Sequence, residues 1–149
     1  FNYGAGKPKR VSRAISFMLM GTLAMNCAMW VLVMLIPERV IGIMTPDPEI
    51  IRLGARCARI YFGAFPFMSL QMTGQNTFVA LNHPRYALFF SLFRKFVLVT
   101  SLTLLLPRIG FGAEGVFWAE FVSQVVGASA CMLTMYRSIW SRLRAAADG

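Results

Sequence analysis

Polar side chains inside long apolar stretches are the residues of this chain whose type and spacing could do chemistry. Gln71 and Gln75 lie one helical turn apart, and Thr22 and Asn26 have the same spacing in an earlier apolar stretch. Amides can hydrogen-bond to ligands and water, and nearby methionines adapt to ligands of varied shape. We therefore take Asn26, Gln71 and Gln75 as candidate residues of a substrate cavity. Helix packing is the alternative, because amides and hydroxyls also join helices across a membrane.

No catalytic constellation accompanies these side chains. The chain has one histidine, His83, and its sequence contains no Ser-His-Asp set, phosphate-binding loop or metal-ligand spacing. The three cysteines, Cys27, Cys57 and Cys131, are far apart and form no CxxC pair, so we expect neither a disulfide framework nor a zinc site. The sequence predicts a protein that is not an enzyme and that uses no cofactor.

Composition favours a lipid bilayer as the surroundings of this chain. Of the 149 residues, 57% are hydrophobic and 14% are charged, whereas a soluble domain has about 25% charged residues. Four apolar stretches are each long enough for a spanning helix, which needs roughly 20 residues. We predict an all-α membrane protein with four transmembrane helices, over residues 14–37, 60–81, 86–106 and 116–136.

The basic residues alternate between the connectors and so predict an orientation. Ten of the 15 lysines and arginines lie in the N-terminal segment, around the third connector at Arg85, or in the C-terminal segment. The other two connectors are nearly neutral. Because positive charge marks the cytoplasmic side of short loops, we expect both termini in the cytoplasm. Orientation also explains the net charge of +9 better than nucleic-acid binding does.

Two of the predicted helices contain features that should shape them. Asp47 and Pro48 should cap and start the second helix, and Pro66 should bend it. In the third, the uncharged part after Lys95 has only 12 residues, which is too short to cross a membrane alone. Arg94 and Lys95 must therefore either extend to the cytoplasmic interface or face the protein interior.

The fourth predicted span carries a stripe of small residues and one carboxylate. The small side chains recur every four residues, at Ala119, Ser123, Gly127 and Cys131. Such a stripe lets another helix approach closely, so we interpret it as a packing surface. A carboxylate within a span is often functional, but Glu120 lies near the start of this span, and we expect it at the membrane interface.

Several segments of the chain, in this order and spacing, resemble one family of transporters. They are FNYGAGKPKRV (1–11), FVALNHPR (78–85), FRK (93–95), LLLP (104–107) and GAEGVFWA (112–119). The first resembles the cytoplasmic loop before the ninth helix of the multidrug and toxic compound extrusion (MATE) family. The resemblance covers essentially the whole chain. It implies the last four helices of a twelve-helix, two-lobe antiporter, and we expect residues 1–149 to be the C-terminal part of its second lobe.

The resemblance also implies a function. It implies a multi-pass protein, which we expect in the bacterial cytoplasmic (inner) membrane, that exports organic, often cationic compounds as sodium ions or protons enter. The expected partners are the bilayer, the preceding helices of the same chain, an organic cation and the coupling ion. Some members bind that ion through an acidic residue in the tenth helix, yet residues 60–81 contain neither Asp nor Glu. Gln124 and Phe121 stand where many members have an acidic residue and a proline, so no coupling-ion ligand is assigned.

Two alternatives remain beside the MATE exporter. A flippase of lipid-linked sugars shares the two-lobe fold, but such proteins tend to line the cavity with basic residues that hold phosphates. Here only Arg94 and Lys95 approach the bilayer interior. A stand-alone four-helix membrane scaffold would need its polar stripes only for assembly.

Overall fold

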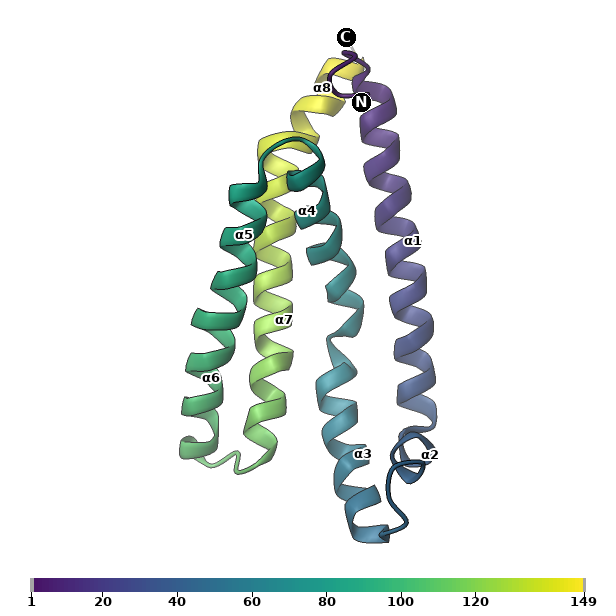
Figure 1. The fold of residues 1–149 in the computed structure, drawn as a ribbon, viewed down its shortest axis with the longest axis vertical. Coiled ribbons are helices and arrows are strands. Elements are labelled where there is room, and N and C mark those ends of the chain that lie inside the picture. Colours follow the sequence, from purple (N-terminus) through teal and green to yellow (C-terminus); the bar gives the residue numbers. More distant parts are fainter. Residues whose placement is uncertain (1, 149) are drawn as a thin grey trace.

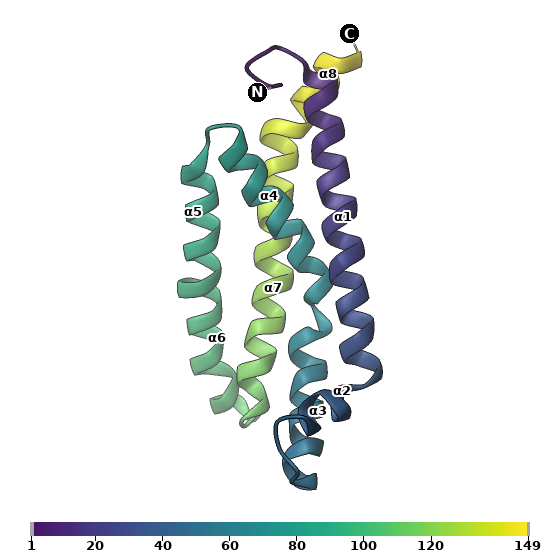
Figure 2. The same ribbon diagram turned by 45° about the vertical axis from the view of Figure 1, so that its right-hand side comes forward.

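The computed structural model describes residues 2–148, which form helices and turns. The helices build an up-and-down bundle of four rods (Figures 1 and 2). Both ends of the chain lie at the same end of the bundle (Figure 1). The first rod is α1 (Pro8–Leu35), and the short α2 (Pro37–Gly42) follows it. The second rod consists of α3 (Pro48–Gly63), η1 (Phe65–Phe67) and α4 (Met68–Ala80). The third rod consists of α5 (Pro84–Leu92), η2 (Phe93–Val99), α6 (Thr100–Leu105) and η3 (Leu106–Ile109). The fourth rod consists of α7 (Glu114–Met135), η4 (Tyr136–Trp140) and α8 (Ser141–Asp148).

Local sequence signals determine where α3 begins. Pro48 occupies the first helical position, where its missing N–H removes no hydrogen bond. The Asp47 carboxylate accepts hydrogen bonds from the backbone N–H groups of Glu49, at 2.9 Å, and Ile50, at 3.4 Å. The predicted cap is therefore confirmed.

The break at Pro66 divides the second rod. α3 ends at Gly63, a single 3₁₀ turn follows, and α4 begins at Met68. Proline lacks the N–H that an α-helix needs at an interior position, and its ring crowds the preceding turn. The Ser69 hydroxyl donates to the Pro66 carbonyl oxygen at 2.5 Å, so a side chain satisfies one backbone group at the break.

Three helical stretches of the described chain are long and apolar enough to cross a membrane. They are Pro8–Leu35, Pro84–Ile109 and Glu114–Ala146. The predicted span over residues 60–81 is interrupted at η1, so it is not one continuous helix. The chain is thus an all-α, multi-pass membrane protein.

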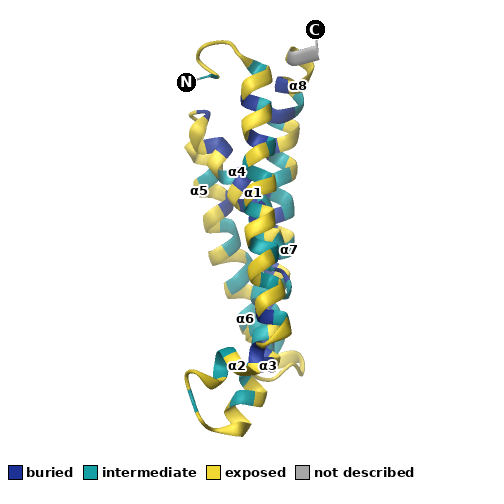
Figure 3. Cartoon of the chain, turned by 90° about the vertical axis from the view of Figure 1, so that its right-hand side faces the viewer, coloured by how far each residue is buried: buried dark blue, intermediate teal, exposed yellow. Residues whose placement is uncertain are grey.

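Apolar packing is concentrated toward the end of the bundle that holds the termini. Trp140 is buried there, and its indole N–H donates to the Ser12 hydroxyl at 2.9 Å, which joins the fourth rod to α1. Many large apolar side chains are nevertheless exposed, and Figure 3 shows that much of α1 consists of exposed residues. Phe17, for example, is 79% exposed. Such surfaces need lipid or more protein to cover them. The buried cluster comprises Val11, Ile15, Phe78, Leu81, Phe90, Cys131, Met135, Ile139, Trp140 and Leu143.

The small-residue stripe of α7 packs against α4 at Cys131 and against the third rod at Gly127. Ala119, Ser123 and Cys131 are fully buried. On the facing helix, a Cβ atom added at Gly74 would lie only 2.8 Å from the Cys131 sulfur. Only a residue without a side chain permits this approach, so the predicted packing role of the stripe is confirmed.

Candidate functional site

α4 lies among α1, α5 and α7, so the bundle buries uncharged polar side chains on more than one side of it. We call this set, which consists of Ser69, Gln71, Thr73 and Thr77, the neutral face. Ser69, Thr73 and Thr77 share one side of the helix, and Gln71 lies on another. Each of its members is at most 7% exposed. The Thr73 hydroxyl lies 3.5 Å from that of Thr22 on α1, so the face meets polar groups of the first rod.

The three predicted cavity residues lie in different surroundings. Gln71 is buried, on a different side of α4 from Thr73. Gln75 is half-buried, and its Nε2 donates to the Ala87 carbonyl oxygen of α5 at 3.3 Å, as the packing alternative predicts. On α1, the Nδ2 of Asn26 is enclosed and has no hydrogen-bond partner among the described residues. Within residues 2–148 no hydrogen bond joins any two of these three side chains.

A charged cluster between the third and fourth rods is the feature that sequence reasoning missed. We define it as Arg94, Lys95, Glu120 and Gln124. Arg94 Nη1 donates to Glu120 Oε1 at 2.8 Å and to Gln124 Oε1 at 2.7 Å. Lys95 Nζ donates to the same Glu120 oxygen at 3.3 Å. The Arg94 and Glu120 side chains are only 12% and 15% exposed, so Glu120 is paired and largely buried in the bundle, while its position at the membrane interface stays a prediction.

Backbone features of both rods position Arg94. It lies on η2, a π-helical segment, and such segments are frequent at functional sites. On α7, Gly127 leaves space for it, because a Cβ atom there would lie 3.0 Å from Arg94 Cγ. Of the two orientations that the sequence left open, Arg94 takes the interior one, whereas the Lys95 side chain is 54% exposed.

A cavity of about 210 Å³ adjoins the charged cluster. All four residues of the cluster line it. The second rod supplies the rest of the wall, with Tyr61 on α3, Phe65 in η1 and Met68 on α4. The helix break and the π-helical segment thus border the same space, in which charged, aromatic and thioether groups meet.

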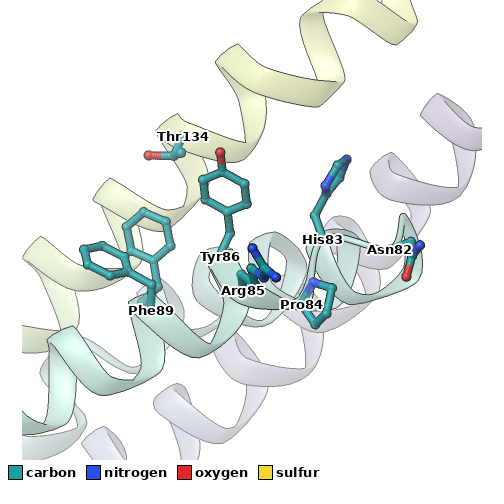
Figure 4. Close-up of a pocket in the computed structure, with 8 residues that line it drawn as sticks. Asn82, His83, Pro84, Arg85, Tyr86, Phe89 and Thr134 are labelled. Atoms are coloured by element: carbon teal, nitrogen blue, oxygen red, sulfur yellow. The ribbon is translucent and has the colours of Figure 1, made fainter.

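A larger and more open cavity, of about 980 Å³, lies at the turn between α4 and α5. Asn82 reverses the chain there with φ of +64°, a left-handed conformation that asparagine adopts more readily than most residues. Tyr86 and Phe89 extend from α5 toward α7, which contributes Thr134 (Figure 4). His83 from the turn also lines this cavity. Aromatic rings thus make up half of the residues that line it, and Arg85 adds a positive charge.

Ion pairs hold the end of the bundle away from the termini. Arg56 pairs with Glu114 at 2.7 Å, which links α3 to α7, and Arg59 pairs with Glu38 at 2.9 Å. Burial raises the pKa of the Cys57 thiol, and the Glu114 carboxylate raises it further, while Arg56 lowers it. These ion pairs are largely exposed and contribute little stability, so we assign no site to this region.

Comparison with known proteins identifies the family. A family model described as MatE matches residues 1–105, which is more than half of the chain. No curated protein and no solved structure matches it significantly. The matched region contains the first two rods, with the neutral face and the helix break, and the third rod as far as the end of α6. The chain therefore belongs to the MatE family, whose members are membrane efflux transporters and not enzymes.

Proposed function

We propose that this chain is part of a cation-coupled antiporter that exports organic, often cationic compounds from the bacterial cytoplasm. Sodium ions or protons moving inward would supply the driving force. The family match and the membrane-length helices support the proposal. The implied partners are the lipid of the inner membrane and further helices of the same protein.

The observation that carries the proposal is the broken second rod with its buried polar residues. Binding sites of secondary transporters are typically built on discontinuous helices near the middle of the bilayer. Here η1 interrupts the second rod, and the neutral face begins immediately after it. A stable packing helix in an apolar bundle needs neither feature.

The order of the rods along the chain supports a membrane crossing by the second rod, in addition to the other three. α1 runs from the end with the termini to the opposite end, yet α5 begins near the end with the termini (Figure 1). The segment between them, α3 with α4, must therefore run the length of the bundle. The four crossings would bring both termini to one side. The basic residues that lie there, such as Arg10 and Arg137, favour the cytoplasmic side.

The depth of the glutamines fits a substrate cavity. Gln75 and Gln71 precede the turn at Asn82 by seven and 11 residues, which places them about 10 and 16 Å along the helix. The hydrocarbon core is about 30 Å thick, so both would lie near its middle. Gln71 and Asn26 would supply polar groups to a transported molecule. The family match does not favour the sugar flippase or the scaffold.

The test replaces Gln71 and Gln75 together with leucine in the full-length protein. Membrane insertion should be intact, because the span becomes more apolar, while export of at least one cationic dye should fall severalfold. Asn76→Leu is the matched control, since Asn76 lies on the same helix but is exposed. Equal export by the double variant and the parent across a panel of dyes, at equal expression, would show that the glutamines serve only helix packing.

A further inference from the structure

The charged cluster contains more positive charge than an ion pair requires. Arg94 and Lys95 both donate to one carboxylate oxygen of Glu120, so two cations face one anion. Arg94 is ten residues past Pro84, which places it about 15 Å along the third rod, close to the level of the neutral face. A net positive charge at such a depth is costly unless an anion accompanies it.

Hydrogen-bond donors also outnumber acceptors in the cluster. A guanidinium has five N–H donors, an ammonium three and a primary amide two. The Nε of Arg94 and the Nε2 of Gln124 are buried without a partner among the described residues. Because an unsatisfied buried donor is costly, a molecule rich in acceptors would stabilise this arrangement. The half-exposed Lys95 ammonium is the cation that such a molecule would reach most easily.

The cavity beside the cluster restricts the size and type of an occupant. Its volume of about 210 Å³ is below the roughly 300–1,000 Å³ of sites for drug-sized ligands, so a small molecule is expected. The rings of Tyr61 and Phe65 and the thioether of Met68 line the same cavity as the cations. These groups favour a flat apolar body, because aromatic and thioether surfaces pack well against another ring.

A purely structural ion pair explains fewer features of the charged cluster than a binding site does. Arg94 and Glu120 alone would balance their charges and could pack without a cavity. A second cation, two unpartnered donors and an adjoining cavity add cost without benefit to packing.

We propose that the charged cluster binds a compact monovalent anion, and that the carboxylate of a small aromatic acid is the group it fits best. The carboxylate lies at Lys95 and Arg94, and the ring lies against Tyr61 and Phe65. A small inorganic anion shares the charge but not the ring. This inference goes beyond the export of cations and does not depend on it.

The test measures binding to the purified full-length protein in detergent by isothermal titration calorimetry. The probes are benzoate, its neutral analogue benzamide, and chloride. Benzoate should bind, benzamide should bind at least about tenfold more weakly, and chloride should compete with benzoate only weakly. Chloride binding as tight as that of benzoate would assign the site to an inorganic anion and overturn the aromatic acid.

Two substitutions with opposite effects on benzoate affinity distinguish an anion-binding site from a purely structural ion pair. Lys95→Gln makes the cluster neutral and should weaken benzoate binding about tenfold. Glu120→Gln adds one unit of surplus positive charge and should tighten it. Lys9→Gln, at the exposed start of α1, is the matched control and should leave binding unchanged. Absence of benzoate binding to the parent, or the reverse order of the two variants, would overturn the proposal. Export of a cationic dye by the same protein, assayed separately, tests the proposed function independently.

Discussion

The neutral face of α4 and the charged cluster are both polar regions within an apolar bundle, but they satisfy their polar groups in different ways. On the neutral face, Ser69 bonds to a carbonyl oxygen of its own rod, Thr73 has a long contact to Thr22, and the Thr77 hydroxyl is buried without a partner among the described residues. In the charged cluster, Arg94 reaches across to Glu120 and Gln124 on another rod, and a cavity remains. A neutral hydroxyl can thus be buried with a local bond or with weak contacts only, whereas a buried charge needs a partner from elsewhere in the fold.

The largest expected effect comes from breaking the ion pair. Arg94→Leu should destabilise the full-length protein by about 3 kcal/mol, because it leaves the buried Glu120 carboxylate with only the half-exposed Lys95. Denaturant unfolding in detergent, followed by circular dichroism, measures this loss. The double variant Arg94→Leu/Glu120→Leu should recover most of it. Arg85→Leu, at an exposed position, is the control, and equal losses for Arg85→Leu and Arg94→Leu would show that the pair contributes nothing.

A smaller effect should follow from disturbing the close packing beside the neutral face. Gly74→Ala places a methyl group against the Cys131 sulfur and should cost about 2 kcal/mol. The matched control is Gly21→Ala on α1, where no atom lies within 4 Å of the added carbon. That change should be neutral or stabilise by up to about 1 kcal/mol. If both alanine variants unfold at the same denaturant concentration, α4 and α7 are not as close as described.

The smallest effect should come from removing one hydroxyl of the neutral face. Thr73→Val keeps the shape of the side chain and loses only a long contact to Thr22, so it should cost less than about 1 kcal/mol. The same unfolding measurement applies. A loss as large as that of Arg94→Leu would mean that the neutral face depends on cross-rod bonds as much as the charged cluster does.

Local features of the fold could be predicted from the sequence, and contacts between rods could not. The cap at Asp47 and the break at Pro66 follow from residue types within a few positions, and the structure confirms both. The bond between Trp140 and Ser12 joins residues 128 positions apart, so it depends on how the first and fourth rods meet. No local pattern encodes such a contact.

At the candidate site, too, local features could be predicted from the sequence and contacts between rods could not. The spacing of Gln71 and Gln75 predicts that they share one side of a helix. It does not predict that Gln75 bonds to a carbonyl oxygen of α5. The sequence allows Arg94 to extend to the interface or to face the interior, because its direction depends on the π-helical segment and on the space beside Gly127. The sequence does contain one signal for the cluster, because Arg94 and Glu120 are opposite charges in two separate apolar stretches. Their pairing requires the register of the third rod against the fourth.

Transport across a closed membrane tests the central claim, cation-coupled export, most directly. The full-length protein is reconstituted in liposomes that contain a cationic dye, and a gradient of protons or of sodium ions is imposed. The account predicts dye movement that follows the sign of one of the two gradients and stops when an ionophore collapses it. Dye movement that ignores both gradients, or that is equal in protein-free liposomes, would contradict it.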